Sequence, residues 1–110
     1  MRGIKNILKM KGEIKLIVLY LIKKKPRSSY DLKKDVVELY GRIPSNGTIY
    51  PLLGDLLLLK LVSSKKDKRK IMYSITKEGK EELNRLKLFF FNKLERMIKF
   101  ASILDSEVLR

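Results

Sequence analysis

The first part of the chain has the apolar spacing of helices. Residues 1–11 mix apolar and basic side chains at helical intervals and predict a short helical arm. From Glu13 to Lys24 the chain is apolar on nearly every side, a pattern that suits a buried helix or a buried strand. We predict a helix, because a run of about three turns has the length of an average helix in globular proteins.

A second helix is predicted after Pro26. Ser28 and Asp31 have the spacing of a capping box, with Asp in place of the usual Glu. Gly41 stands where a left-handed C-terminal cap belongs, so this helix should end at Tyr40. The apolar residues that recur at helical spacing are Leu32, Val36, Leu39 and Tyr40.

A third helix is predicted in the Leu-rich segment that follows. Ser45 is a candidate N-cap residue. Local rules start the helix near Tyr50, because Pro51 fits a first helical turn and Gly54 weakens a helix interior. Its apolar residues are Ile49, Leu52, Leu53, Leu56, Leu57 and Leu59.

Beyond Lys60 the pattern changes to that of strands. Every second residue from Ile71 to Ile75 is large and apolar, which is the alternation of a half-buried strand. The short run Leu61–Ser63 leads into a charged segment from Ser64 to Lys70. These features predict a hairpin with a charged tip.

A long fourth helix is predicted from Thr76, its N-cap residue, to Leu104. Apolar residues at steps of three and four form a seam, which is the spacing of a contact between helices. We predict that a second copy of the chain buries this seam, because so small a chain has little core to cover it. The alternative is one broad amphipathic helix packed on its own domain. The predicted dimer-interface residues are Leu83, Leu86, Phe90, Leu94, Met97, Ala101 and Leu104.

The charge of the chain is unevenly placed. Residues 1–77 contain 19 Lys or Arg and 6 Asp or Glu, a balance of +13, whereas residues 78–110 contain 7 and 6, a balance of +1. A strongly positive body favours a polyanion such as nucleic acid, because each neutralised phosphate releases counterions. The alternative is that excess Lys only keeps a small protein soluble.

The residue types exclude most catalytic chemistry. With no His and no Cys, the chain lacks the usual general base, the thiolate nucleophile and the ligands of most zinc sites. The grouped carboxylates stand at helix starts, where capping and the helix dipole explain them. We therefore predict no enzyme activity, no cofactor and no metal. The apolar runs are shorter than the ~20 residues that span a bilayer, so we predict a cytoplasmic, nucleoid-associated protein without membrane contact.

Three helices, a hairpin with a basic tip and a trailing helix follow the element order of a winged helix-turn-helix domain. The predicted fold class is mainly α with a small β-hairpin. We expect a winged-helix DNA-binding domain with an N-terminal helical arm over residues 1–76 and a C-terminal dimerisation helix over residues 77–110. Such a domain lays its third helix in the major groove, while the hairpin tip touches phosphates.

Three stretches of the chain resemble one family. They are SSYDLKKDVVELYG, PSNGTIYPLLGDL and RKIMYSITKEGKEEL, and together they resemble the PadR family of transcriptional regulators over about residues 11–83. The resemblance implies a dimeric, repressor-type DNA-binding protein whose last helix forms the dimer contact. It also implies that the recognition helix begins before the Tyr-Pro pair, so that Pro51 lies inside its early turns.

The chain departs from the family pattern at two places. After the Pro-Leu-Leu of the recognition helix only Asp55 and Lys60 are charged, so base reading must rest on the start of the helix. Some relatives hold flat aromatic ligands between Trp side chains, and this chain has no Trp. The sequence names no small-molecule effector.

The candidate DNA-binding residues form three groups. Residues at the start of the recognition helix carry short polar side chains for base edges or phosphates, although capping and core packing explain several of them equally well. These residues are Ser45, Asn46, Gly47, Thr48 and Tyr50. The wing cluster has five cations that suit contact with phosphates. The alternative is that they are solvated charges that protect a strand edge from aggregation. They are Lys65, Lys66, Lys68, Arg69 and Lys70. The third group is predicted to contact the DNA backbone, and its alternative role is that of an ordinary solvated helix face. It contains Lys33, Lys34 and Arg42.

The predicted function is that of a sequence-specific regulator that binds double-stranded DNA as a homodimer and represses transcription. The leading alternative is a non-specific DNA-coating protein that uses the same fold for its charge. A peripheral membrane protein, bound through the basic arm, fits the sequence only loosely.

Overall fold

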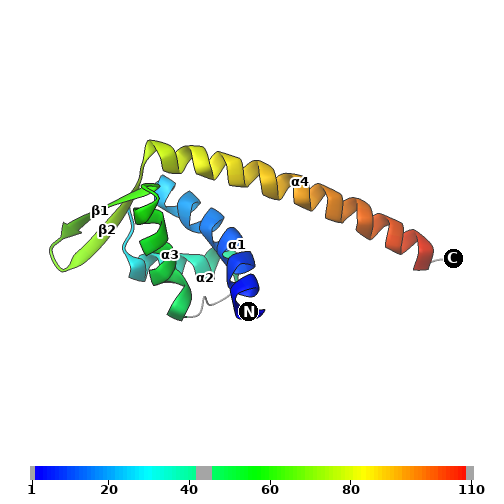
Figure 1. Cartoon of the computed structure of the whole chain (residues 1–110), viewed down its shortest axis with the longest axis horizontal. Helices are drawn as coiled ribbons and strands as arrows, with labels where there is room; N and C mark the ends of the chain where they lie inside the picture. Colours follow the sequence, from blue (N-terminus) through cyan, green and yellow to red (C-terminus); the bar gives the residue numbers. More distant parts are fainter. Residues whose placement is uncertain (1, 42–45, 109–110) are drawn as a thin grey trace.

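The computed structural model describes residues 2–41 and 46–108, and describes side chains for 12–41 and 48–107. Helices and a two-stranded antiparallel hairpin make up the described chain, and the last helix projects far beyond the rest (Figure 1). The elements are α1 (Arg2–Lys24), α2 (Ser29–Tyr40), α3 (Asn46–Leu58), β1 (Val62–Asp67), β2 (Lys70–Ile75) and α4 (Lys77–Val108). The mainly helical winged-helix fold class predicted from the sequence is confirmed.

Helix α1 is continuous from Arg2 to Lys24, so the arm and the first helix predicted as separate elements form one helix. Gly12, which stands between them, does not end the helix. A Cβ atom at Gly12 would lie 3.6 Å from the Cζ atom of Phe90, which shows how closely α4 passes over α1 at this point.

Helix α2 has the ends that its sequence predicts. The Ser28 side chain accepts a hydrogen bond from the Asp31 backbone N–H at 3.2 Å, and the Asp31 carboxylate accepts one from the Ser28 backbone, which completes the capping box. Gly41 has φ 75°, and its N–H donates to the Val37 carbonyl oxygen at 2.8 Å. Both caps are local features, which is why short-range patterns located them.

Helix α3 begins at Asn46, so the start near Tyr50 that local rules predict is wrong, and the earlier start implied by the family resemblance is confirmed. Pro51 lies inside the helix. It removes one backbone hydrogen bond. The residues on either side offset this loss, because Ile49 and Leu53 are almost completely buried in the core.

The hairpin and α4 are joined at a tight junction. The Thr76 hydroxyl donates to the Lys60 carbonyl oxygen at 2.7 Å and accepts from the Gly79 N–H at 3.0 Å, so Thr76 caps α4 as predicted. Gly79 is pressed against the start of β1, because a Cβ atom there would lie 2.0 Å from the Leu61 carbonyl oxygen. The fourth helix extends to Val108, four residues beyond the predicted Leu104.

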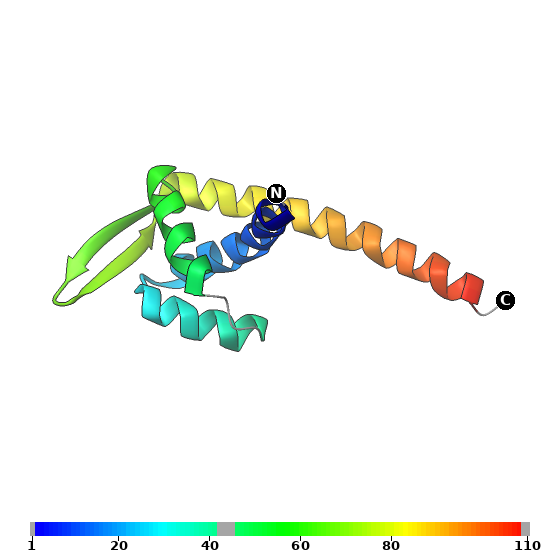
Figure 2. The ribbon, with the colours of Figure 1, turned by 60° about the horizontal axis from the view of Figure 1, so that its bottom comes forward.

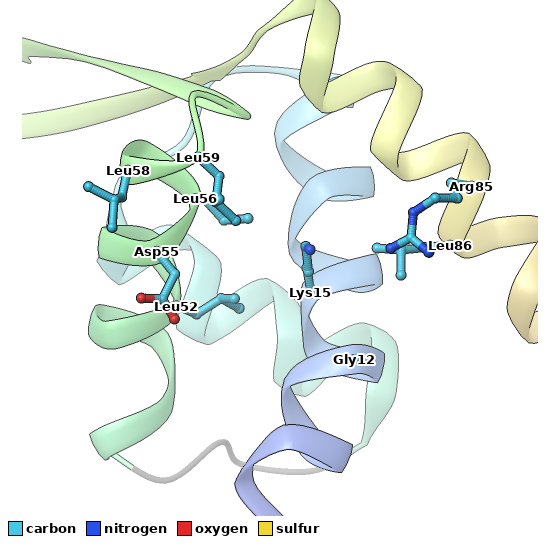
Figure 3. Close-up of a pocket in the computed structure, with 9 residues that line it drawn as sticks. All are labelled: Gly12, Lys15, Leu52, Asp55, Leu56, Leu58, Leu59, Arg85 and Leu86. Atoms are coloured by element: carbon cyan, nitrogen blue, oxygen red, sulfur yellow. The ribbon is translucent and has the colours of Figure 1, made fainter.

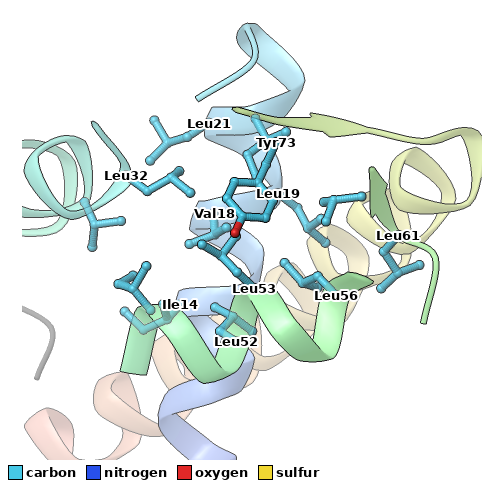
Figure 4. Packing of buried hydrophobic residues seen from close by; sticks show 14 of the residues in the cluster. Ile14, Val18, Leu19, Leu21, Leu32, Leu52, Leu53, Leu56, Leu61 and Tyr73 are labelled. Carbon is cyan, nitrogen blue, oxygen red and sulfur yellow. The ribbon is translucent and has the colours of Figure 1, made fainter. Parts of the chain in front are cut away.

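The core lies where α1, α2, α3 and the hairpin meet (Figure 4). Its largest fully buried side chains come from the three helices: Leu19, Ile22, Leu32, Ile49, Leu53, Leu56, Val18 and Val36. Tyr73 of β2 adds its ring to the same cluster. Leu residues therefore fill the inner face of α3, which explains the Leu-rich run in the sequence.

Arg27 ties the hairpin to the helices. Its backbone pairs with that of Tyr73 through two hydrogen bonds of 3.1 and 2.8 Å. Its side chain donates to the Leu21 carbonyl oxygen at 2.8 Å and forms an ion pair with Asp35. Arg27 therefore links the hairpin to α1 and α2 through both its backbone and its side chain.

Helix α4 packs on α1 only through its first part. Leu83 and Leu86 are buried and Phe90 is half-buried, and all three belong to the intramolecular core. From residue 91 to residue 107 every side chain is exposed. Figure 2 shows α1 between α2 and α4, with the end of α4 extending away from the domain.

Candidate nucleic-acid interface

The basic cluster of the hairpin lies at its tip, where Lys68 and Arg69 form the turn between the two strands. Residues 63–71 are all exposed. Lys68 has φ 58°, a left-handed conformation that a tight hairpin turn demands and that Gly or Asn usually supplies. The outer half of the hairpin thus brings together the five predicted wing cations, all of them exposed: Lys65, Lys66, Lys68, Arg69 and Lys70.

The strand register divides these cations between two faces. Lys66 pairs with Ile71, and Lys65 pairs with Met72. Because side chains alternate along a strand, Lys66 shares the face of Ile71 and Tyr73, whereas Lys65 lies on the opposite face. Only the first of these faces is turned toward the helices, where Tyr73 enters the core.

A cleft of about 270 Å³ opens between this face of the wing, the start of α2 and α3. Residues distant in the sequence meet there: Ser28, Ser29, Tyr30, Tyr50, Arg69, Lys70, Ile71 and Tyr73. Five hydroxyl-bearing residues, two cations and the N-terminal end of a helix line one small space. Each of these groups interacts favourably with an anion, because hydroxyl and backbone N–H groups donate and the helix N-terminus is positive.

Tyr50 connects α3 with α2 inside the cleft. Its hydroxyl oxygen accepts a hydrogen bond from Ser29 Oγ at 3.3 Å, and the Lys33 Nζ atom lies 5.7 Å from the centroid of its ring. About 61% of Tyr50 is exposed. The ring therefore stands on the surface beside the cleft and is not part of the core.

The start of α2 has a distinct electrostatic environment. Hydrogen bonds from the side chain and backbone of Ser28 hold the pKa of the Asp31 carboxyl below its usual range. The positive charges of Lys70 and Lys25 lower this pKa further. The wing and the end of α1 are thus close enough to α2 for their charges to act on its first turn.

The residues predicted at the start of α3 differ in how accessible they are to a ligand. Asn46 and Gly47 form the first turn of the helix, and Ser45 lies outside the described residues. Thr48 is buried, with 9% of its surface exposed, so little of it is accessible to a ligand. Tyr50 is the predicted residue of this helix whose described side chain is most exposed.

The third predicted group lies partly beside the cleft. Lys33 is half-buried against the Tyr50 ring, and Lys34 is exposed on α2. Arg42 lies outside the described residues. The structure therefore brings Lys33 to the cleft, while Lys34 faces solvent.

The sequence motifs do not point to Ser29 and Tyr30, which line the cleft at the start of α2. Tyr30 has 71% of its surface exposed. A large aromatic residue at an exposed helix start was the signal in the sequence, but only the folded chain places the wing opposite it.

A second groove, of about 430 Å³, runs along the other side of α3 (Figure 3). It is mostly apolar and lies between α1, α3 and α4, with Leu52, Leu56 and Leu86 on its walls. Beside it Glu82 binds Lys15 of α1 at 2.7 Å and Arg85 of α4 at 2.5 Å. The hydrogen bond from Arg85, together with the charge of Lys15, lowers the pKa of Glu82 to about 2. This ion-pair network fixes α4 on α1 and has no arrangement for catalysis.

The described residues contain no group of three potential metal ligands. Within the same residues, no helix has the length and apolar character needed to cross a bilayer.

Comparison with protein families matches residues 18–85 to the PadR-like family of transcriptional regulators. The chain belongs to this family. The matched segment runs from α1 through the wing into the start of α4, so it contains every element of the cleft. Proteins of this family are transcriptional regulators and not enzymes, which supports DNA-binding transcription regulation for this chain. Among curated proteins, none matches the chain.

Solved structures have the same fold. A protein described as a transcriptional regulator of Thermoplasma acidophilum is 26% identical, with a TM-score of 0.75 over 84% of this chain and 94% of that one. A PadR-like transcription factor from Bacteroides fragilis is 23% identical, with a TM-score of 0.72 over 90% and 98% of the two chains. A PadR-family regulator from Eggerthella lenta is 22% identical, with a TM-score of 0.75 over 88% and 89%.

Proposed function

We propose that this PadR-family chain is a sequence-specific transcriptional repressor that binds an operator as a homodimer. In this proposal α3 enters the major groove, and the wing contacts the adjacent phosphates. The observation that carries the proposal is the cleft in which Arg69 and Lys70 of the wing face the Ser29 and Tyr50 hydroxyl groups.

The cleft supports a defined division of roles. Its hydroxyl, backbone and cationic groups suit one phosphate of the DNA backbone, which would set the position of the protein on the duplex. The first turn of α3, which contains Asn46, would then lie closest to the bases. Because Asn pairs well with adenine in the major groove, we expect Asn46 to contribute most to sequence preference.

A homodimer would present two such surfaces. Two copies related by a two-fold axis bind half-sites that are about one helical turn apart, so the operator should be nearly palindromic. This role places the protein in the cytoplasm, on the nucleoid.

The test compares a labelled duplex from the gene's own upstream region with a scrambled duplex of equal length at about 0.2 M salt, where non-specific contacts are weak. Fluorescence anisotropy should show a preference of about 1000-fold for the upstream duplex. Tyr50→Phe removes only the hydroxyl, and Lys99→Gln on α4 serves as the matched surface control. We expect weaker binding for the first variant and unchanged binding for the second.

A non-specific DNA-coating protein is the second candidate. The observation that favours it is the outer end of α3, where Leu58 is 82% exposed and Leu59 is 58% exposed, because Leu side chains form no hydrogen bonds to base edges. Equal affinity for the upstream and scrambled duplexes, with a steep loss of both at high salt, would support this candidate and argue against autoregulation.

A further inference from the structure

The side of α3 that faces away from the core has few polar groups. Its exposed residues recur at steps of three and four, which places them on one side of the helix. They are Pro51, Gly54, Asp55 and Leu58, and we call them the outward face of α3. Leu53 and Leu56 bury the opposite side in the core. Among the described side chains of α3, those of the outward face include no cation and one carboxylate.

Leu58 is the most exposed of the large apolar residues that the structure describes, with 82% of its surface accessible. It stands at the edge of the groove between α1, α3 and α4, but its side chain points away from α1 (Figure 3). The hairpin extends toward the same side of α3 as Leu58. Leu59, the next residue, points toward α1 instead. Leu58 therefore shares a side of the molecule with the wing cations.

Gly54 leaves the middle of the outward face without a side chain. A Cβ atom there would meet no heavy atom of this chain within 4 Å, so packing inside the protein does not require glycine at this position. Glycine in a helix interior nevertheless weakens the helix relative to Ala. A close approach of the backbone to a second surface gives the missing side chain a physical reason.

The charges around this face identify the second surface. The wing cations on the same side attract a polyanion, whereas the Asp55 carboxylate is repelled by phosphates. Base edges in the major groove are therefore a better match for the outward face than the DNA backbone is. Leu58 forms no hydrogen bond, and the 5-methyl group of thymine is the apolar group that a base pair presents in the major groove.

We propose that Leu58 recognises thymine through apolar contact with its 5-methyl group, and that Gly54 lets the helix come close enough for this contact. The inference rests on the proposed function, in which α3 enters the major groove. It extends base recognition from the first turn of α3 to the last residue of the helix. It also gives Leu58 a role in specificity that needs no hydrogen bond.

Replacing thymine with uracil tests the contact directly. Uracil lacks only the 5-methyl group and pairs with adenine in the same way. The natural chain first enriches duplexes from a random pool, and the enriched duplex is then synthesised once with thymine and once with uracil. Fluorescence anisotropy at about 0.2 M salt compares the two affinities. We expect the thymine duplex to bind at least about fourfold more tightly, the effect of one buried methyl group.

Two variants assign this preference to one side chain. Leu58→Ala should reduce the ratio of thymine to uracil affinity about fourfold and leave the affinity for the uracil duplex within about twofold of the natural value. Leu59→Ala is the matched control, because it shortens the same type of side chain on the neighbouring residue, which points toward α1. The control should keep the full ratio. An unchanged ratio in Leu58→Ala would overturn the proposal.

The same experiment separates failure of the inference from failure of the proposed function. Enrichment of a sequence motif together with equal affinity for thymine and uracil would refute only the methyl contact. Absence of any enrichment would refute sequence-specific binding, and the methyl contact with it, since a preference for thymine itself enriches certain sequences.

Gly54→Gln provides an independent readout. The structure has room for the new side chain, because nothing lies within 4 Å of the added Cβ atom. On DNA the longer side chain should hold the outward face away from the bases, so the ratio of thymine to uracil affinity should fall to within about twofold of one. Circular dichroism checks that the variant is folded. A folded Gly54→Gln chain that keeps the full ratio would show that the outward face does not approach the bases.

Discussion

Gly79 at the start of α4 lies in close contact with the hairpin junction. A Cβ atom there would lie 2.0 Å from the Leu61 carbonyl oxygen and 2.7 Å from Ile75 Cγ1. Both neighbours belong to the hairpin junction, and a backbone oxygen cannot move aside as the end of a flexible side chain can. Glycine is therefore required at this position by contact and not by backbone conformation.

We expect Gly79→Ala to lower the free energy of unfolding by about 3 kcal/mol, because the new methyl group forces the junction apart. Urea denaturation measures this change. Gly54→Ala is the matched control, since a Cβ atom at Gly54 meets nothing within 4 Å. The control should stabilise the protein by about 0.5–1 kcal/mol through helix propensity. Equal effects of the two substitutions would contradict this account.

Glu82 should make stability depend on acid pH. Arg85 and Lys15 lower its pKa from the usual 4.5 to about 2, so the folded chain holds this carboxylate ionised at pH values where the unfolded chain protonates it. The stabilisation is therefore complete above pH 4.5 and is lost as the pH falls toward 2.

Glu82→Gln should accordingly lower the melting temperature at pH 7 and reduce the further decrease between pH 4.5 and 2. Thermal unfolding followed by circular dichroism at several pH values measures both effects. Glu95→Gln, on the projecting part of α4, provides the control and should follow the natural chain. If melting temperature plotted against pH runs parallel for Glu82→Gln and the natural chain, the ion pairs contribute nothing to the pH dependence of stability.

At the scale of elements, the wing has two unequal faces. Lys66 lies on the face of Ile71 and Tyr73, beside the cleft, whereas Lys65 lies on the face of Met72. If the cleft holds a phosphate, only the first of these cations is well placed to add a second phosphate contact.

We expect Lys66→Gln to reduce the slope of log affinity against log salt by about one, the effect of one lost phosphate contact. Lys65→Gln removes the same charge from the opposite face and should change the slope by less. Anisotropy titrations with the upstream duplex at several salt concentrations provide the comparison. If the two substitutions reduce the slope by the same amount, the DNA contacts both faces of the wing.

At the scale of the whole molecule, α4 begins on the winged-helix domain and continues as a long exposed extension. Its first part is held on α1 by Leu83, Leu86 and the Glu82 ion pairs, while the remainder is exposed. Any partner on the exposed part would set the distance between two copies of α3. The position of half-sites in an operator would then follow from the geometry of this helix.

If the chain assembles as the proposed homodimer, Leu94→Asp is expected to convert it into a monomer, because the substitution places a charge on the exposed apolar surface of α4. Sedimentation equilibrium measures the assembly. Affinity for a duplex with two half-sites should fall to that for a single half-site, since the gain from linking two binding surfaces is lost. The protein should remain folded, as Leu94 is 57% exposed. A variant that stays dimeric would place the contact elsewhere.

Much of this fold was predictable from the sequence, because the residues that begin and end its helices lie close together along the chain. The capping box of Ser28 and Asp31, the Gly41 cap and the Thr76 cap each depend on residues within four positions. The start of α3 was not predictable by local rules, because the burial of Ile49 and Leu53 in the core outweighs the preference of Pro51 for a first turn.

The sequence by itself determined the order of elements, the basic tip of the wing and the seam of α4, since periodicity and charge are properties of the chain. Only the tertiary structure decided how these parts are used. Packing on α1 takes Leu83 and Leu86 into the core, so their predicted place in a dimer interface stays a prediction, while Leu94 is left exposed. Folding also brings Ser29, Tyr50 and Arg69 into one cleft, because contacts between distant segments depend on the shared core and not on any local pattern.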